Sequence, residues 1–179
     1  MSAVVLFGGG CFWCIEPAFA ALKGVTQAHP GYSGGTSHYP TYHQVCQQNT
    51  GHIEVVQVRY KPEEINFKTL LDVFFSLHDP TTLDRQGNDI GPQYASAIFY
   101  TTHEQLEQAK SYIKQLEKKL NQPIVTKLIP AKVFWPAEPE HFNYYLNNLE
   151  VPYSQAVIQP KLREFARNYR PLIKTKEDD

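Results

Sequence analysis

Residues 3–14 read AVVLFGGGCFWC, an apolar run that meets three glycines and then a Cys-x-x-Cys pair. The apolar run predicts a strand, and the segment from Cys11 to about Leu22 predicts a helix. Glycines at the junction free the backbone to turn and to approach a ligand. A helix that begins here points unpaired N–H groups at Cys11, which favours the thiolate and predicts a lowered pKa. Cys11 is therefore a candidate nucleophile, the alternative being a buried thiol packed as a small hydrophobic side chain.

The composition is that of an ordinary globular domain. The chain has 179 residues, of which 42% are hydrophobic, and 17 Lys and Arg against 18 Asp and Glu leave a formal charge of −1. A nucleic-acid-binding protein normally carries a basic excess, so that class is excluded. The sequence has no secretory signal and no apolar stretch long enough for a membrane span, which predicts a cytoplasmic protein. In a reducing compartment, Cys11, Cys14 and Cys46 are expected to be redox-active or metal-binding and not structural crosslinks.

A second informative residue lies in the strand predicted over 53–60. Alternation with period two places Glu54 on the same face as Val56, Val58 and Tyr60. A carboxyl group on an apolar face loses hydration, so its pKa rises toward the range in which it donates a proton near neutrality. The alternative is a glutamate at the strand end whose carboxylate simply reaches water.

The rest of the chain mixes strands and helices without strict alternation. A glycine-rich polar loop is expected over 31–51, and Thr102 with Gln105 forms a capping box for one of the helices. This pattern predicts a single-domain α+β fold, a two-layer sandwich with a mixed, mainly antiparallel sheet and a ferredoxin-like core. Within it we expect a catalytic core over 1–150 and a C-terminal extension over 151–179 that packs on the same domain. Further predicted helices cover about 66–78, 102–120 and 160–169, and further strands cover 26–32, 95–100 and 124–129.

Six sequence blocks together resemble the signature of the A-type peptide methionine sulfoxide reductases. They occur in the family's order, cover nearly all of the chain and weaken after about Tyr145. The blocks are GGCFWCIE at 9–16, GYSGG at 31–35, PTYHQVC at 40–46, TGHIE at 50–54, HDP at 78–80 and RQGNDIGPQY at 85–94.

The resemblance implies roles for particular residues. Cys11 corresponds to the nucleophile that attacks sulfur, and Glu54 corresponds to the acid that protonates the sulfoxide oxygen. Tyr42 and Tyr94 correspond to the two tyrosines that donate hydrogen bonds to that oxygen, and Asp89 to a supporting aspartate.

The resemblance also implies a substrate wall and a catalytic cycle. Phe12 and Trp13 correspond to the apolar wall that accepts the S-methyl group. Attack leaves Cys11 as a sulfenic acid, which a second thiol condenses to a disulfide. Cys14 lies one helical turn away, within disulfide range, so we expect it to resolve Cys11, with Cys46 as a relay partner or a passive thiol.

The implied activity is reduction of the S epimer of methionine sulfoxide, peptide-bound and free, as part of protein repair under oxidative stress. Thioredoxin is the expected reductant of the disulfide. No organic cofactor, metal, nucleic acid or membrane is implied as a partner.

The sequence departs from the family pattern at two places. Tyr153 and Ser154 stand where many relatives have a resolving cysteine, which puts relay through the tail in doubt and favours Cys14. Ile90 stands where some relatives have histidine, which alters the polarity of the site without removing a proposed catalytic group.

Two other functions use the same cysteines. A thioredoxin-like oxidoreductase also has Cys-x-x-Cys at a helix start, but its chemistry needs neither paired tyrosines nor Glu54. A zinc site of Cys11, Cys14, Cys46 and either His43 or His52 is chemically feasible, although a second Cys-x-x-Cys or Cys-x-x-His arm is missing.

Overall fold

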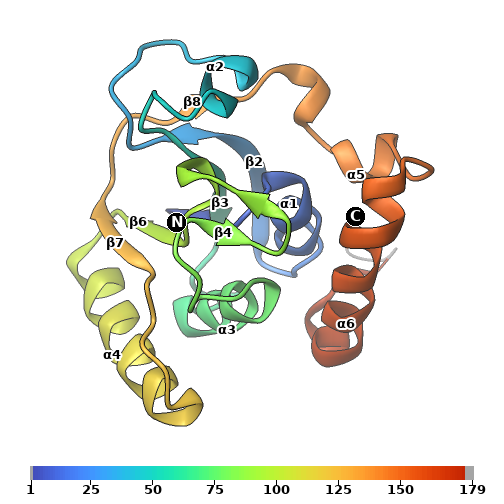
Figure 1. Ribbon diagram of the computed structural model, residues 1–179. Coiled ribbons are helices and arrows are strands. Elements are labelled where there is room, and N and C mark those ends of the chain that lie inside the picture. The colour runs from blue at the N-terminus through green and yellow to red at the C-terminus, as the bar shows by residue number, and fades with distance from the viewer. Residues whose placement is uncertain (1, 176–179) are drawn as a thin grey trace.

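The computed structural model describes residues 2–175; part of the predicted C-terminal extension, 176–179, lies outside them. The chain forms a six-stranded sheet, a separate two-stranded hairpin and a set of helices (Figure 1). The sheet strands are β1 Ala3–Gly8, β2 Val25–Ser33, β3 Ile53–Tyr60, β6 Ala97–Tyr100, β7 Lys127–Pro130 and β8 Trp135–Pro136, and the hairpin strands are β4 Arg85–Gln86 and β5 Asp89–Ile90. The helices are α1 Phe12–Ala20, α2 Tyr42–Cys46, α3 Phe67–Leu77, α4 His103–Leu120, α5 Tyr144–Asn147 and α6 Gln159–Tyr169, with single turns η1 Pro92–Tyr94, η2 Pro139–His141, η3 Ser154–Ile158 and η4 Arg170–Leu172.

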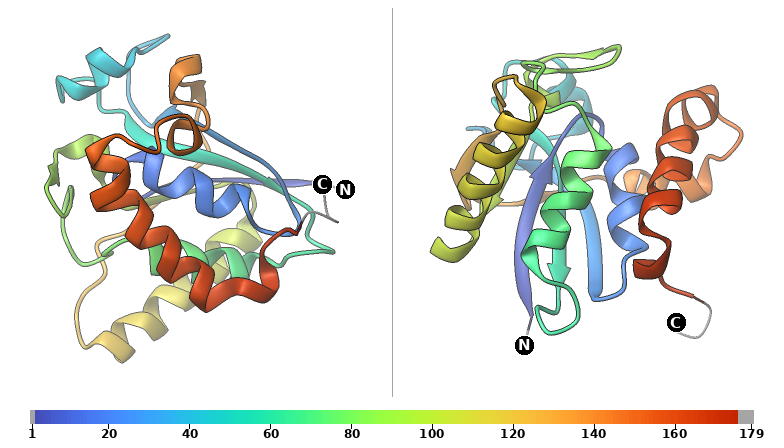
Figure 2. Two further views of the ribbon diagram at one scale, coloured as in Figure 1. Left: turned by 90° about the vertical axis from the view of Figure 1, so that its right-hand side faces the viewer. Right: turned by 90° about the horizontal axis from the view of Figure 1, so that it is seen from below.

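The sheet is mixed, as the sequence predicts. Its strand order is β7-β6-β1-β3-β2-β8, and β6 and β7 form its parallel pair while the other neighbours are antiparallel. Figure 2 shows α4, α3, α1 and α6 side by side when the molecule is seen from below. The expected α+β class is confirmed.

The main core lies between the sheet and these helices, because each strand and helix turns its apolar positions toward the other. Phe7 of β1 stacks on Phe19 of α1 and Phe74 of α3, with ring centroids 5.0 and 4.7 Å apart. Helix α3 begins where Asn66 accepts the N–H of Thr69 at 2.8 Å, and its apolar residues recur at helical spacing on the buried side. The core therefore fixes α1 relative to the strands that flank it.

The N-terminus of α4 differs from the predicted capping box. The Thr102 hydroxyl accepts the N–H of Gln105 at 3.1 Å, but the Gln105 carboxamide does not return to Thr102. It turns inward and donates to the Val4 carbonyl at 3.1 Å and to the Tyr60 hydroxyl at 3.0 Å. Gln105 is buried, and its Oε1 accepts the N–H of Thr101 at 2.8 Å, so the carboxamide both satisfies interior oxygens and caps the chain one residue before Thr102.

The segment after β2 contains more structure than the predicted polar loop. Helix α2 interrupts it, and Thr41 and Gln44 form the reciprocal capping box that is missing at α4, with bonds of 3.2 and 3.0 Å. In the C-terminal part, α6 packs against α1 and α3. The division at residue 150 stays a prediction.

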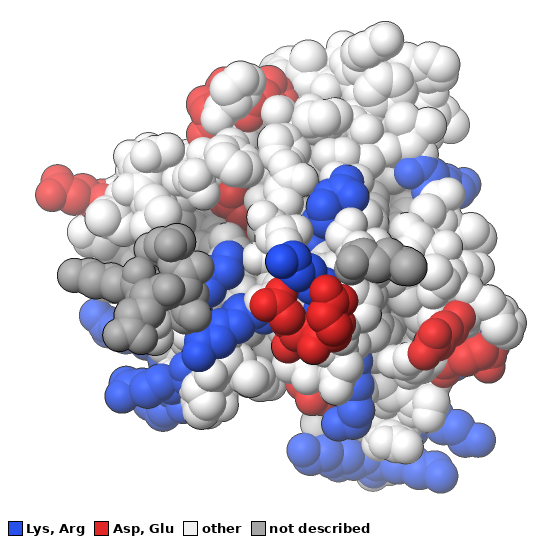
Figure 3. Space-filling view, turned by 180° about the vertical axis from the view of Figure 1, so that it is seen from behind, with Lys and Arg blue, Asp and Glu red and all other residues white. Residues whose placement is uncertain are grey.

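The face opposite to that of Figure 1 shows how the charges are distributed. Acidic and basic groups alternate over its lower half and the upper half is mostly uncharged (Figure 3). This interspersion fits a chain whose formal charge is near zero. Within residues 2–175, none of the helices has the length and apolarity needed to cross a membrane.

Candidate active site

The turn between β1 and α1 presents Cys11. Gly10 has φ of +89°, which an L side chain rarely adopts, and its N–H donates to the Tyr94 carbonyl at 3.2 Å. Cys11 then takes an extended conformation as the N-cap of α1, where it is 5% exposed. The glycines thus make the sharp turn and dock the Tyr94 segment beside the thiol.

Glu54 lies beneath this helix end, on the apolar face of β3 as predicted. Its side chain is fully buried, and Oε1 accepts the N–H of Phe12, the first residue of α1, at 3.1 Å. The pKa of Glu54 is raised to about 8: burial is the largest cause, the Phe12 N–H opposes the rise, the Asp89 charge adds to it and the hydrogen bond with the Cys11 thiol also opposes it. The protonated form of Glu54 therefore predominates below about pH 8, and this form can donate a proton.

The second oxygen of Glu54 is the unusual atom of the site. Among residues 2–175, buried Oε2 has no partner with good hydrogen-bond geometry. An unpaired buried oxygen of a carboxylate is costly, whereas the hydroxyl of a protonated carboxyl group can donate to an incoming acceptor. Glu54 thus presents one unoccupied proton donor next to Cys11.

The predicted lowering of the Cys11 pKa is wrong. Burial and then the charges of Glu54 and Cys14 raise its pKa well above the usual value, and the N–H of Trp13 opposes the rise only partly. The N–H groups at the helix end lower the pKa of Cys11 as expected, but the lost hydration of the buried thiolate raises this pKa by more. The raised pKa therefore favours the neutral thiol form of Cys11 at neutral pH.

Two phenols share this acidic environment. Tyr42 is the first residue of α2 and Tyr94 the last of η1. Burial raises the pKa of both hydroxyls, and the charges of Glu54 and Cys11 raise it further. Both tyrosines therefore stay protonated as hydrogen-bond donors. The structure brings them together with Cys11 and Glu54 from four separate segments.

Phe12 and Trp13 differ in their access. Phe12 is fully buried among the rings of Tyr32, Tyr42 and His141. Trp13 is only partly buried, and its indole stacks on Tyr144 with centroids 3.7 Å apart. Trp13 is thus the more accessible of the two rings, with Phe12 behind it.

Two supporting residues are not predicted by the sequence analysis. His141 is buried, accepts the indole N–H of Trp13 at 3.0 Å and stacks on Tyr42 with centroids 4.5 Å apart. Glu138 accepts the Tyr32 hydroxyl and the Tyr42 N–H, each at 2.9 Å. Neither residue lies in a periodic segment, so no sequence signal indicates these contacts.

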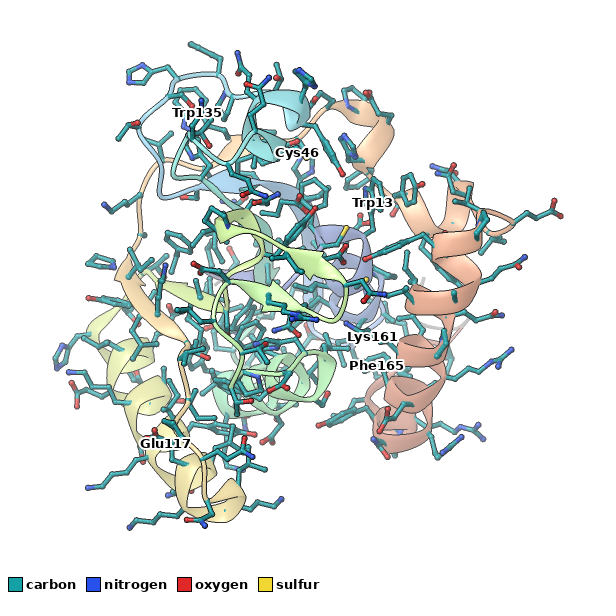
Figure 4. The ribbon with its side chains drawn as sticks, in the orientation of Figure 1. Trp13, Cys46, Glu117, Trp135, Lys161 and Phe165 are labelled. Carbon is teal, nitrogen blue, oxygen red and sulfur yellow. The ribbon has the colours of Figure 1, made fainter. Side chains whose placement is uncertain are left out.

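The thiols differ in their surroundings. Cys14, in the first turn of α1, lines a cleft of about 490 Å³ together with Cys11 and Asp89. Cys46 lies at the far end of α2, where burial raises the pKa of its thiol and a hydrogen bond with Tyr42 partly opposes the rise. Figure 4 shows Cys46 and Trp13 near the same end of the sheet. Cys14 follows Cys11 by three residues, so one turn of α1 places the two side chains on the same side, as expected.

The proposed zinc ligands do not converge. Both ring nitrogens of His52 are engaged, with the Gly35 N–H at 3.0 Å and the Ser37 carbonyl at 2.8 Å. His43 pairs with Gln47 instead. In the described part of the chain, the group of three possible ligands is Glu138, Glu140 and His141, which contains no cysteine. The cysteines are therefore better suited to redox chemistry.

Comparison with known proteins decides the family. The family model described as peptide methionine sulfoxide reductase matches residues 3–172. The chain belongs to this family. It is 51% identical to MsrA of Chromobacterium violaceum, over 94% of this chain and 97% of that protein, and 47% identical to MsrA of Sulfolobus acidocaldarius, over 93% and 94%.

A solved structure of another protein has the same fold. Reduced Mxr1 of Saccharomyces cerevisiae superposes with a TM-score of 0.78 at 30% identity, covering 84% of this chain and 87% of that one. Mxr1 has also been solved in complex with Trx2. Membership of the family replaces the thioredoxin-like alternative.

Proposed function

We propose that the chain reduces the S epimer of methionine sulfoxide, in peptides and as the free amino acid, to methionine. The observation that supports this most directly is the buried Glu54 next to the Cys11 thiol, whose pKa is raised to about 8 and whose Oε2 has no hydrogen-bond partner among residues 2–175. Sulfoxide reduction needs a nucleophile on sulfur and an acid on oxygen, since the oxygen cannot leave as a bare anion. The epimer and the peptide-bound substrate rest on the family resemblance.

The first step uses the groups around Cys11. The sulfoxide oxygen accepts hydrogen bonds from Tyr42 and Tyr94, and the substrate methyl group lies against Trp13, with Phe12 behind it. Cys11 sulfur attacks while Glu54 gives its proton to oxygen, and the thiol proton then restores Glu54. Methionine leaves, and Cys11 keeps the oxygen as a sulfenic acid, so one thiol and one sulfoxide become one sulfenic acid and one thioether.

The second step removes that oxygen as water. Cys14 attacks the Cys11 sulfenic acid and forms an intramolecular disulfide. The shared cleft and the single helical turn between them support Cys14, while Cys46 sits beside Tyr42 and is proposed as a passive thiol or a later relay. Asp89 supports this step through its hydrogen bond with Tyr153.

Thioredoxin is the proposed external reductant, and oxidised proteins and free methionine sulfoxide are the proposed substrates. The chemistry balances without an organic cofactor or a metal, because each electron pair comes from thiols. A dithiol donor regenerates Cys11 and Cys14 by exchange through a mixed disulfide. The Trx2 complex of Mxr1 supports this choice of donor.

For the fold, we infer that the strand order β6-β1-β3-β2 with α1 and α3 on one side is a ferredoxin-like two-layer core. Each of β1 and β3 is followed by a helix that crosses to the next strand of this set. This arrangement brings the end of β1 and the start of β3 to one place, where Cys11 and Glu54 meet.

The test compares both sulfoxide epimers with thioredoxin and with dithiothreitol as reductant. Cys11→Ser should abolish methionine formation, and Glu54→Gln should lower its rate by about 10²–10⁴-fold. Glu63→Gln changes an exposed glutamate in the same way and should have no effect. Retained activity in Cys11→Ser, or equal reduction of both epimers, would overturn the proposal.

A further inference from the structure

A directed chain of hydrogen bonds begins at Cys14. The Tyr153 hydroxyl donates to Oδ2 of Asp89 at 2.7 Å and lies 3.5 Å from the Cys14 sulfur. A tyrosine hydroxyl has one proton, so when it donates to Asp89 its oxygen can only accept from the Cys14 thiol. The proton of Cys14 therefore already points along a path toward a carboxylate.

A cation faces the same thiol. Lys161 of α6 lines the cleft that contains Cys11, Cys14 and Tyr153, and Figure 4 shows its side chain between α6 and α1. Among residues 2–175, its ammonium forms no ion pair. A partly buried cation without a carboxylate partner acts on whatever negative charge develops nearby.

The electrostatics agree with this geometry. Burial raises the pKa of Cys14, Lys161 and then the Tyr153 hydroxyl lower it, and the charges of Asp89 and Glu54 raise it. These groups come from α6, the N-cap of η3, β5 and β3, and Cys11, the N-cap of α1, lies beside the thiol. The other titratable groups that line the cleft are His78, Asp79 and Glu164. Burial lowers the pKa of His78 in the interior and the charge of Lys161 lowers it further, so the Lys161 charge acts on the interior side of the cleft.

We propose that Tyr153 and Lys161 drive the second step of the cycle, in which Cys14 attacks the sulfenic acid of Cys11. Tyr153 is a catalytic residue because it touches the reacting sulfur, and Lys161 is a positioning residue that stabilises the Cys14 thiolate. This inference rests on the proposed role of Cys14 as the resolving thiol.

The step balances as follows. Cys14 passes its proton to the Tyr153 oxygen as Tyr153 gives its own to Asp89, and the thiolate attacks the Cys11 sulfur. The S–S bond forms, the S–O bond breaks, and the departing hydroxide takes the proton that Asp89 has received, so that water leaves and Asp89 is again a carboxylate. The Cys11 sulfur is reduced and the Cys14 sulfur is oxidised, so no further electron donor is needed until the disulfide is recycled.

If Tyr153 acted only through packing, removing its hydroxyl would leave the rate of disulfide formation unchanged. Its ring also packs edge-on against Trp13, with centroids 5.8 Å apart. Tyr153→Phe keeps that packing and removes only the hydroxyl. Any defect confined to the disulfide step then reports on the hydroxyl and not on the shape of the site.

The experiment separates the two steps in a single turnover. Reduced protein is mixed with excess methionine sulfoxide without a reductant, and methionine, free thiols and sulfenic acid trapped by a cyclic 1,3-diketone are followed with time. We expect Tyr153→Phe and Lys161→Met to form methionine within about threefold of the normal rate but to form the disulfide at least about tenfold more slowly, with sulfenic acid accumulating.

The pH dependence of disulfide formation distinguishes the field of Lys161 from simple packing. Loss of the cation should move the alkaline rise of this step to higher pH in Lys161→Met, and Lys161→Arg should restore it. Arg163→Met removes an exposed cation from the same helix and should change neither step.

The controls keep this inference apart from the proposed function. If Cys14→Ser still forms an intramolecular disulfide, Cys14 is not the resolving thiol and both proposals about it are wrong. If Cys14→Ser accumulates sulfenic acid while Tyr153→Phe and Lys161→Met form the disulfide at the normal rate, only the present inference is overturned. Equal slowing of both steps would also overturn it, because that result indicates a distorted site.

Discussion

The main-chain N–H of Phe12 donates to Oε1 of Glu54 at 3.1 Å, so the residue after the nucleophile holds the acid. The first turn of α1 therefore performs two tasks. It presents the Cys11 thiol and, through the next N–H, orients a carboxyl group from β3 whose other oxygen is left for a substrate. The nucleophile and the acid cannot move apart without breaking this bond.

The pH dependence of methionine formation should follow Glu54. The pKa of this carboxyl is about 8, raised first by burial, so the acid form predominates below pH 8 and declines above it. We expect kcat/KM for single-turnover reduction to fall as pH rises through about 8, and this fall to be absent from the residual activity of Glu54→Gln.

A second measurement checks the coupling of the same two groups. After burial, the Glu54 charge is the largest cause of the raised Cys11 pKa. Alkylation of Cys11 in a Cys14→Ser, Cys46→Ser background should begin at lower pH when Glu54 is replaced by Gln. An unchanged alkylation profile would show that the carboxyl and the thiol are not coupled.

Glu54 should also lower the stability of the fold at alkaline pH. Its pKa is about 8 in the folded protein and near 4.3 when unfolded, so the folded state binds more protons between these values. Stability from this group is therefore greatest below pH 4 and falls as pH rises to about 8. Glu54→Gln should be more stable than the natural protein at pH 9, by on the order of 1–4 kcal/mol, with a much smaller difference at pH 5.

Denaturant unfolding at both pH values measures this difference. Glu63→Gln, the exposed counterpart, should show no such dependence. A Glu54→Gln variant that is less stable at pH 9 would mean that the charged carboxylate is satisfied inside the protein.

Much of the fold follows from local patterns. Strand β3 occupies the predicted 53–60, and the period-two argument correctly places Glu54 on the core face, because one register satisfies all of its apolar positions. The predicted helices over 66–78, 102–120 and 160–169 are confirmed within a few residues. In α3 and α4, the apolar spacing agrees with a capping residue, Asn66 or Thr102, at the N-terminus.

The site is less predictable where it depends on distant segments. The helix end correctly marks Cys11, but its expected low pKa fails because burial, a tertiary property, outweighs the helix dipole. His141 and Glu138 support Tyr42 from about 100 residues away, in a segment without periodicity. Contacts of this kind are set by the packing of the whole chain, which no local pattern encodes.

Glu16 should hold residues 143–148 against α1. Its buried carboxyl accepts the N–H of Asn143 through both oxygens, at 3.1 and 2.9 Å, beside an apolar cleft of about 400 Å³ between α1 and α6. The next residue, Tyr144, stacks on Trp13. Glu16→Leu removes the acceptor and should speed amide exchange of residues 143–148 about tenfold, whereas Glu16→Gln should keep it slow.

Hydrogen exchange with peptide-level resolution measures this effect. The same variant should loosen the Tyr144–Trp13 stack and raise KM for peptide substrates while Cys11 alkylation stays unchanged. Equal exchange in Glu16→Leu and Glu16→Gln would show that packing alone retains the segment.

Gly10 and Gly87 offer a matched test of the turn that presents the nucleophile. Both have positive φ, +89° and +58°, but a side chain at Gly87 would meet nothing within 4 Å, whereas one at Gly10 would lie 2.9 Å from Cγ of Gln86. Gln86 cannot swing away easily, because its carboxamide is bonded to the N–H and the carbonyl of Asp79. Gly87→Ala should therefore cost about 1 kcal/mol of backbone strain, and Gly10→Ala about 2–4 kcal/mol.

Thermal unfolding of the two variants gives both losses of stability. Methionine formation should fall only in Gly10→Ala, since a shifted Gly10 also moves Cys11 and releases the Tyr94 carbonyl. If the two variants lost equal stability and formed methionine at equal rates, the turn at Gly10 would tolerate a side chain as well as Gly87 does.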